Sequence, residues 1–128
     1  MPGEREIVDA AAAPQAIGPY SHAVRAAGLL FCSGQIPLDP RSGELVGDTP
    51  AEQARRCLQN LSEVCAAAGT SLAQALRLTI YTTRLSAFGE INEVYGSFFD
   101  EHPPARAAVG VAELPKGALV EIDAIVAL

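Results

Sequence analysis

One arginine and one glutamate near the end of the chain are the residues best placed to do chemistry. Arg106 begins an alternating segment in which it shares one side with Gly110. Glu121 lies in a second alternating segment, Ala118 to Val126, on the side opposite the apolar residues. If residues 113–118 form the turn of a hairpin, Glu121 falls opposite Gly110, where no side chain fills the space. The sequence therefore predicts a pocket with a cation and a carboxylate on one face of a hairpin.

The elements expected to position this hairpin are strands and two helices in a chain of 128 residues. Alternating apolar residues predict strands, and apolar residues three and four apart predict helices. The expected strands are Ile7 to Asp9, Ser21 to Arg25, Leu29 to Gln35, Leu76 to Thr83, Arg106 to Ala112 and Ala118 to Val126. The expected helices run from Thr49 to Gly69 and from Ser86 to Asp100. We interpret residues 1–128 as a single domain.

The first helix is the most strongly marked element. Thr49 and Glu52 form a capping box, and Gly69 marks the end of the helix. Its apolar stripe includes Cys57 and Cys65, which we interpret as core residues.

Two helices can cover only one face of such a sheet. The other face would need water or another subunit, because it would carry polar side chains. These residues are Arg77, Tyr81, Arg106, Glu121 and Asp123.

Composition excludes several classes of partner. The net charge of −6 and the single Lys disfavour nucleic acid, whose backbone is bound by clustered basic residues.

Three cysteines without paired or metal-type spacing predict free thiols in a reducing cytoplasm. The start of the chain is acidic, and no apolar run is long enough to cross a membrane. We interpret His22 and His102 as loop residues without metal-ligand spacing, and no phosphate-binding glycine motif occurs.

Three segments resemble the reactive intermediate deaminases, also called the RidA or YjgF family. They are Ala16 to Ser21, Ser33 to Pro37 and Arg106 to Asp123, in the family's order and spacing. The resemblance implies a chorismate-mutase-like α+β fold, with a mixed, mostly antiparallel sheet and two helices on one face. It also implies a homotrimer whose open sheet faces meet around a central barrel, with sites between the subunits.

The same resemblance implies a hydrolase without cofactor or metal. The substrates would be small 2-imino acids and their enamine tautomers, which water converts to 2-keto acids as ammonia leaves. Three alternatives stay open: a protein that binds 2-keto acids without turnover, a pathway-specific deaminase, and an endoribonuclease. The acidic charge speaks against the last of these.

Six residues match the family's site. Arg106 matches the carboxylate-binding arginine, whose planar guanidinium can make two parallel hydrogen bonds. Glu121 matches the acid that positions or deprotonates the attacking water. The residues that would line the pocket or contact substrate and water are Tyr20, Ser33, Gly34 and Asn92. Structural roles are the alternatives: Arg106 could form a salt bridge across the trimer, and Glu121 could be solvated or paired with Arg77.

The chain departs from the family pattern at three places. Ala108 stands where many members have Cys, His22 stands where Gln is common, and the loop from Asp100 to Pro103 is short. These differences change the shape and polarity of the pocket, so the resemblance leaves the choice of substrate open.

Overall fold

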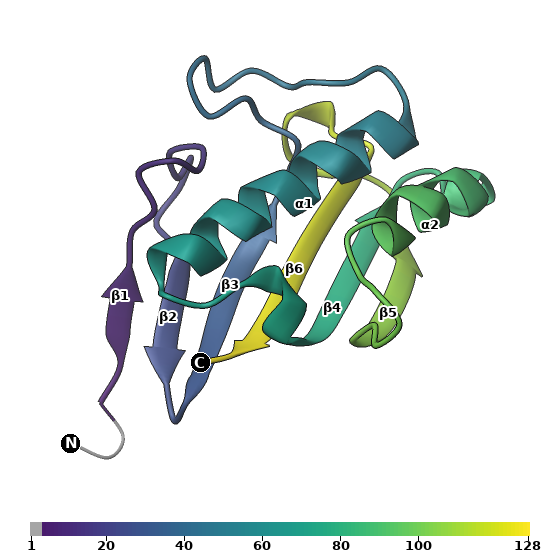
Figure 1. Cartoon of the computed structure of the whole chain (residues 1–128). Helices are drawn as coiled ribbons and strands as arrows, with labels where there is room; N and C mark the ends of the chain where they lie inside the picture. Colours follow the sequence, from purple (N-terminus) through teal and green to yellow (C-terminus); the bar gives the residue numbers. More distant parts are fainter. Residues whose placement is uncertain (1–3) are drawn as a thin grey trace.

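Six strands form one sheet, and two helices pack on one of its faces in the computed structural model, which describes residues 4–128 (Figure 1). The strands are β1 (Glu6–Val8), β2 (Ala23–Ala26), β3 (Leu29–Gln35), β4 (Ala75–Thr82), β5 (Ala105–Gly110) and β6 (Val120–Ala127). The helices are α1 (Pro50–Ala67) and α2 (Phe88–Gly96), with short 3-10 turns at Leu72–Gln74, Leu85–Ala87 and Pro115–Gly117. The part of the predicted acidic start that precedes residue 4 lies outside the described residues.

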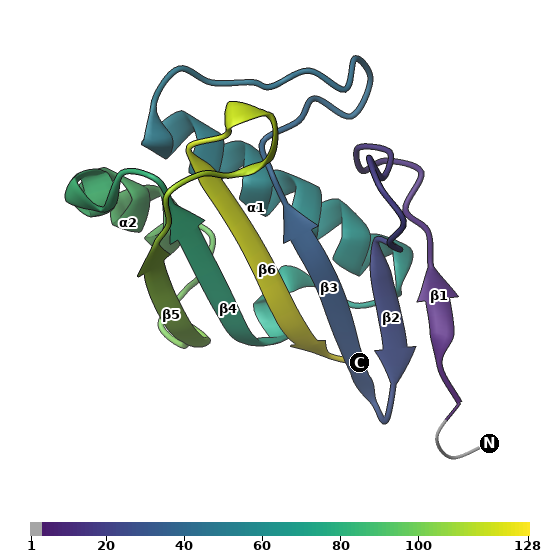
Figure 2. The same ribbon diagram turned by 180° about the vertical axis from the view of Figure 1, so that it is seen from behind.

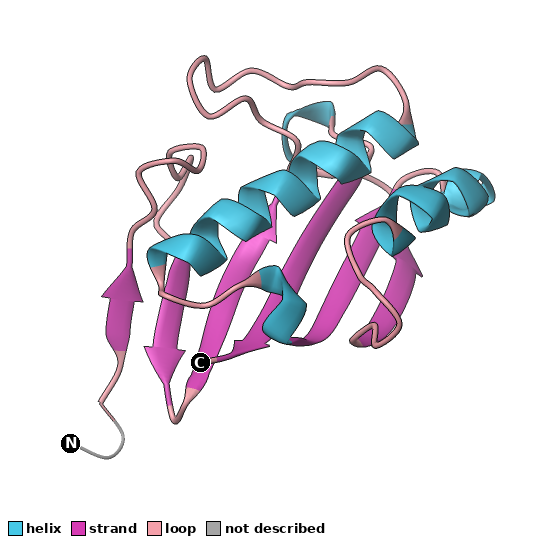
Figure 3. Cartoon of the chain, in the orientation of Figure 1, coloured by secondary structure: helices cyan, strands magenta, loops and turns pink. Residues whose placement is uncertain are grey.

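The sheet is mixed and mostly antiparallel, in the order β1-β2-β3-β6-β4-β5. Among the strands of residues 4–128, only the pair β4 and β5 is parallel, and the other neighbouring strands are antiparallel. Both helices lie on the same face (Figure 3), and the view from behind shows the other face uncovered (Figure 2). The predicted α+β class and the placement of the helices are confirmed.

Helix α1 begins and ends where its local sequence predicts. The Thr49 hydroxyl accepts a hydrogen bond from the Glu52 amide at 3.2 Å, and it donates one to the Glu52 carboxylate at 3.1 Å. Cys57 and Cys65 are fully buried against the sheet, and all three cysteines are free thiols. The interpretation of Cys57 and Cys65 as core residues is therefore confirmed.

The predicted hairpin between the last two strands is wrong. Strand β4 lies between β5 and β6, pairing in parallel with β5 and antiparallel with β6. Glu121 is therefore paired with Tyr81 of β4, not with Gly110. The connection from β5 to β6 therefore passes β4 and does not form a hairpin turn.

The end of α2 and the register of β4 also differ from the sequence prediction. Helix α2 ends at Gly96, whereas the apolar pattern suggested a helix reaching Asp100. In β4 the pairing register shifts between Ala75 and Arg77, so Leu76 is bulged out and half exposed although its alternation predicted burial. Within residues 4–128, no helix combines the length and the apolar character needed to cross a bilayer.

Candidate active site

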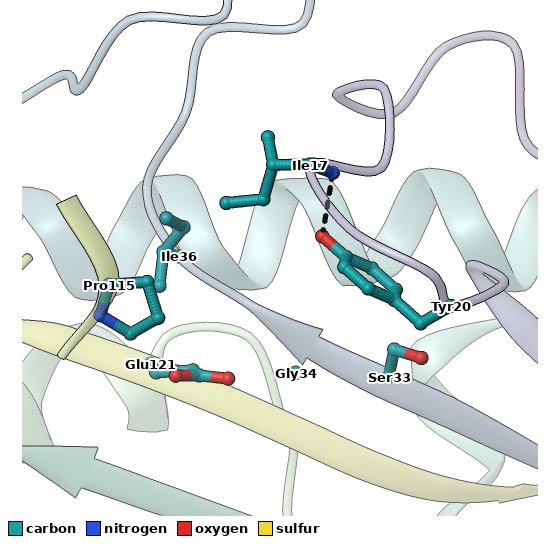
Figure 4. Close-up of a pocket in the computed structure, with 7 residues that line it drawn as sticks. All are labelled: Ile17, Tyr20, Ser33, Gly34, Ile36, Pro115 and Glu121. Atoms are coloured by element: carbon teal, nitrogen blue, oxygen red, sulfur yellow. Dashed lines mark hydrogen bonds between the residues drawn. The ribbon is translucent and has the colours of Figure 1, made fainter.

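Glu121 lies in a cavity of about 210 Å³ at the start of β6 (Figure 4). Strand β3, the loop before β2 and the turn before β6 together provide the walls. The lining residues are Ile17, Tyr20, Ser33, Gly34, Ile36, Pro115 and Glu121. We call this cavity the Glu121 pocket. Four of the six predicted site residues meet there.

A β-bulge in β3 opens the sheet beside Glu121. Between Cys32 and Gln35 the strand contains one residue more than the facing segment of β6, so Ser33 and Gly34 leave the regular ladder. The Ser33 hydroxyl donates to the Ser21 carbonyl at 2.6 Å, which ties the bulge to the loop that carries Tyr20. The bulge thus determines both the width of the pocket and the position of its rim.

Gly34 allows the Glu121 carboxylate to lie directly on the strand. A Cβ atom at Gly34 would overlap the Glu121 Oε2 atom and would lie 3.0 Å from Cδ. Any side chain at this position would therefore displace the carboxylate. The backbone conformation of Gly34 is ordinary, so the close approach is the reason for glycine here.

The environment of Glu121 favours its protonated form. Burial raises the pKa of the Glu121 carboxyl above its ordinary value of 4.5, and the nearby Asp123 carboxylate raises it further. Asp123 accepts a hydrogen bond from the Tyr81 hydroxyl at 3.2 Å on the same open face. A carboxylate with a raised pKa is a better proton acceptor, as a general base requires.

Arg106 lies on the opposite face of the sheet. It is paired with the buried Leu78 of β4, so its side chain points toward α2. Its Nη1 atom donates to Asn92 Oδ1 at 2.5 Å, and its Cζ lies over the rings of Phe88 and Tyr95. Burial raises the pKa of the Tyr95 hydroxyl, and the Arg106 charge opposes this effect.

A second cavity, of about 450 Å³, surrounds this arginine. Its walls are formed by α2, by the loop that follows the helix and by the start of β5. The lining residues are Asn92, Tyr95, Gly96, Phe99, Asp100, Pro103, Pro104 and Arg106. We call it the Arg106 pocket. It shares no lining residue with the Glu121 pocket.

The predicted site is therefore divided within one chain. Tyr20, Ser33, Gly34 and Glu121 belong to one pocket, and Arg106 and Asn92 belong to the other. The prediction that Arg106 and Glu121 share a face of the sheet is wrong, because Glu121 aligns through Tyr81 with Val109, one residue away from the predicted Gly110. The placement of Glu121 and Asp123 on the open face is confirmed, because the residues that alternate with them along β6 are buried on the other face.

Sequence reasoning missed several residues that shape the two pockets. Ile17, Ile36 and Pro115 are apolar loop residues that become walls only through tertiary contact. Asn60 is fully buried in α1, and its amide donates to the carbonyls of Ile36 and Leu38 at 3.3 and 3.0 Å. A polar residue inside the apolar stripe of a helix was the available signal for such a structural role.

His22 has a structural role in the loop before β2. Its Nδ1 atom accepts a hydrogen bond from the Ala10 amide at 2.8 Å, and Nε2 lies 2.7 Å from the Pro14 carbonyl. With Nδ1 as the acceptor, Nε2 is the ring atom that donates to the Pro14 carbonyl. Among residues 4–128, no three His, Cys, Asp or Glu residues are grouped in a way that could hold a metal ion.

Comparison with known proteins identifies the family. The family model described as Endoribonuclease L-PSP matches residues 10–128. The mouse 2-iminobutanoate/2-iminopropanoate deaminase is 43% identical over 121 residues, covering 94% of this chain and 90% of the mouse protein.

Solved structures agree in fold. A protein of the Rid family from Yersinia pestis, YyfA, has a TM-score of 0.94 at 39% identity, covering 98% of this chain and all of that one. The E. coli protein TdcF, solved with bound serine, has a TM-score of 0.90 at 43% identity, covering 96% and 98% of the two chains. The chain belongs to the RidA/YjgF family.

Proposed function

We propose that this protein hydrolyses small 2-imino acids to 2-keto acids and ammonia without a cofactor. The observation that carries the proposal is the half-buried Glu121 carboxylate, held against the Gly34 backbone in an apolar pocket with its pKa raised. The names of relatives support the same chemistry, since the mouse protein is named as a 2-iminobutanoate/2-iminopropanoate deaminase. The similar E. coli protein TdcF was solved with bound serine, a small amino acid.

The proposed reaction needs a carboxylate-binding group and a base. Arg106 binds the substrate carboxylate and so fixes the position of the imine carbon. Glu121 accepts a proton from water as the water oxygen bonds to the carbon of the protonated imine, and the C=N electron pair moves to nitrogen. Glu121 then gives this proton to the nitrogen, which becomes an ammonium leaving group. The C–N bond breaks as the hydroxyl gives its proton to Glu121, so that ammonia leaves and the carbonyl of the 2-keto acid forms.

Arg106 and Glu121 can act on one substrate if the two pockets come from neighbouring subunits. The arrangement within one chain supports this part of the proposal, because each pocket holds only half of the required groups. The open sheet face also exposes Phe31, and the edge strand β5 exposes Val109, which is apolar surface suited to a subunit contact. We propose the homotrimer implied by the family resemblance.

Native mass spectrometry tests the assembly. We expect a particle of three chains, each of 13.3 kDa, at micromolar concentration. The physical reason is the uncovered sheet face together with the unpaired edge of β5, both of which a closed ring of subunits would bury. A monomer at that concentration would contradict the assembly and would leave Arg106 and Glu121 apart.

The experiment that tests the reaction is a hydrolysis assay with imines generated in situ from several amino acids by an amino acid oxidase. We expect the wild-type protein to accelerate the formation of 2-keto acid with at least one small substrate. If the protein binds 2-keto acids but never accelerates hydrolysis, a non-catalytic binding protein replaces the proposal. Incubation with RNA at low salt tests the endoribonuclease alternative.

Adding one methyl group at Gly34 should impair turnover while leaving the fold intact. In Gly34→Ala the new Cβ displaces the Glu121 carboxylate, so we expect the hydrolysis rate to fall by about tenfold or more, because misplaced groups lose catalysis steeply. The displaced group is the flexible end of a side chain, so the melting temperature should change little. Gly89→Ala is the matched control, because a Cβ there has no atom within 4 Å beyond its immediate backbone. Equal activity of Gly34→Ala and wild type would contradict the proposed position of the carboxylate.

A further inference from the structure

Three side chains of α2 point at the guanidinium of Arg106. Phe88, Asn92 and Tyr95 follow one another at intervals of four and three residues, so they share one face of the helix. The Arg106 Cζ lies 5.1 Å from the centroid of the Phe88 ring and 5.0 Å from that of Tyr95. Both distances lie within the range of a cation–π attraction.

These contacts use different parts of the guanidinium. Asn92 Oδ1 accepts one hydrogen bond from Nη1, whereas the two rings attract the positive charge through their π faces. A guanidinium has five N–H donors in one plane. The group can thus be held by three side chains and still offer several donors to a carboxylate. Arg106 itself is exposed, so these contacts are what restrict its orientation.

The Tyr95 ring, and not its hydroxyl, accounts for the placement of this residue. Tyr95 is 4% exposed, and its hydroxyl is buried without a hydrogen-bond partner among the described residues. The ring packs against Phe99 with the centroids 4.8 Å apart, which fixes its position beside Arg106. An unpaired buried hydroxyl is unfavourable, so phenylalanine should serve here at least as well.

We propose that Phe88 and Tyr95 are positioning residues that orient the Arg106 guanidinium for binding the substrate carboxylate. The proposal rests on the proposed function, because it takes Arg106 as the group that binds this carboxylate. The proposal adds a role for two aromatic residues of α2 that the sequence pattern assigns to the hydrophobic core. They determine how tightly 2-keto and 2-imino acids bind. A lysine at position 106 would keep the positive charge but lose the planar group that stacks on the rings and makes paired hydrogen bonds.

Calorimetric titration with 2-oxobutanoate tests the proposal on the purified, assembled protein. Tyr95→Leu and Phe88→Leu should each weaken binding by about three- to tenfold, the scale of one cation–π contact. Tyr95→Phe should bind within about twofold of wild type, because it keeps the ring. Phe98→Leu is the matched control: Phe98 is also a half-buried aromatic residue that packs against the core, but the rings over which the Arg106 Cζ lies are those of Phe88 and Tyr95.

A second readout reports on the arginine without any ligand. In the NMR spectrum, the Arg106 Nε–H signal should be displaced by the ring currents in wild type and in Tyr95→Phe. It should move toward the position of a free arginine in Tyr95→Leu and Phe88→Leu, and it should be unchanged in Phe98→Leu. If Tyr95→Leu does not fold, Phe88→Leu carries the test, because Phe88 is only half buried.

Two results would overturn the inference. One is wild-type affinity in both leucine variants, and the other is a loss in Tyr95→Phe as large as in Tyr95→Leu. A wild-type protein that binds 2-oxobutanoate through these rings but does not hydrolyse imines would refute the proposed catalysis and leave this inference standing. A wild-type protein that binds no 2-oxobutanoate would overturn both.

Discussion

Glu121→Gln should lower the rate of imine hydrolysis by about 100-fold or more, the usual scale for losing a positioned acid–base group. Glutamine keeps the shape of glutamate and can lie against the Gly34 backbone in the same way, but it cannot accept a proton from water. Binding of 2-oxobutanoate should therefore survive. The measurement is the hydrolysis rate beside calorimetric binding for wild type and variant. Full activity in Glu121→Gln would show that another group activates the water.

The pH profile provides an independent check on Glu121. The active form is the ionised carboxylate, so the rate should fall as the pH drops through a pKa above the ordinary 4.5. This acidic limb should be missing from the residual activity of Glu121→Gln. In Asp123→Asn it should move to lower pH, because one cause of the raised pKa is removed.

The same shift has a consequence for stability. The folded pKa lies above the unfolded one, so the contribution of Glu121 to stability is present below pH 4.5 and is lost as the pH rises through the raised pKa. In thermal unfolding at several pH values, the melting temperature of Glu121→Gln should therefore rise relative to that of wild type as the pH increases.

Arg106→Lys should reduce kcat/KM by about 100-fold although the charge is retained, because misorientation of a bound substrate costs that much. The lysine ammonium is a point charge, so it cannot hold a carboxylate by two parallel hydrogen bonds. It also loses the geometry of the contacts with Asn92 and the two rings. Steady-state kinetics and calorimetry measure the loss in turnover and in binding.

The control for this variant is Arg55→Lys, the same substitution on the exposed face of α1. It should leave both the kinetics and the binding unchanged. Wild-type activity in Arg106→Lys would mean that a single positive charge is sufficient, and it would remove the reason for an oriented guanidinium.

The sequence by itself determined the elements whose signals are local. Thr49 and Glu52 mark the start of α1 because a capping box is complete within four residues. The hairpin of β2 and β3 follows from alternation around Gly28, whose φ of 76° suits a tight turn. Glu121 could be placed on the uncovered face for the same reason, since its neighbours along β6 are apolar on alternate positions.

Only the tertiary structure decided which strands are neighbours. The alternation around Arg106 was correct, but alternation gives the two sides of a strand without stating which side faces the helices. The parallel pairing of β5 with β4 settles this, since Arg106 lies beside the buried Leu78. Pairing between distant segments depends on how the whole sheet packs, so no local sequence pattern predicts it.

In the two pockets, too, some features could be predicted from the sequence and others depend on the fold. Tyr20, Ser33 and Gly34 were identified as site residues through their family motifs, and the fold gathers them around Glu121. The separation of Arg106 from this group, and the use of Phe88 to hold it, depend on contacts between α2 and β5. An aromatic residue in an apolar helix stripe has the same sequence signal whether it fills the core or supports a cation, and only its neighbours in space distinguish the two.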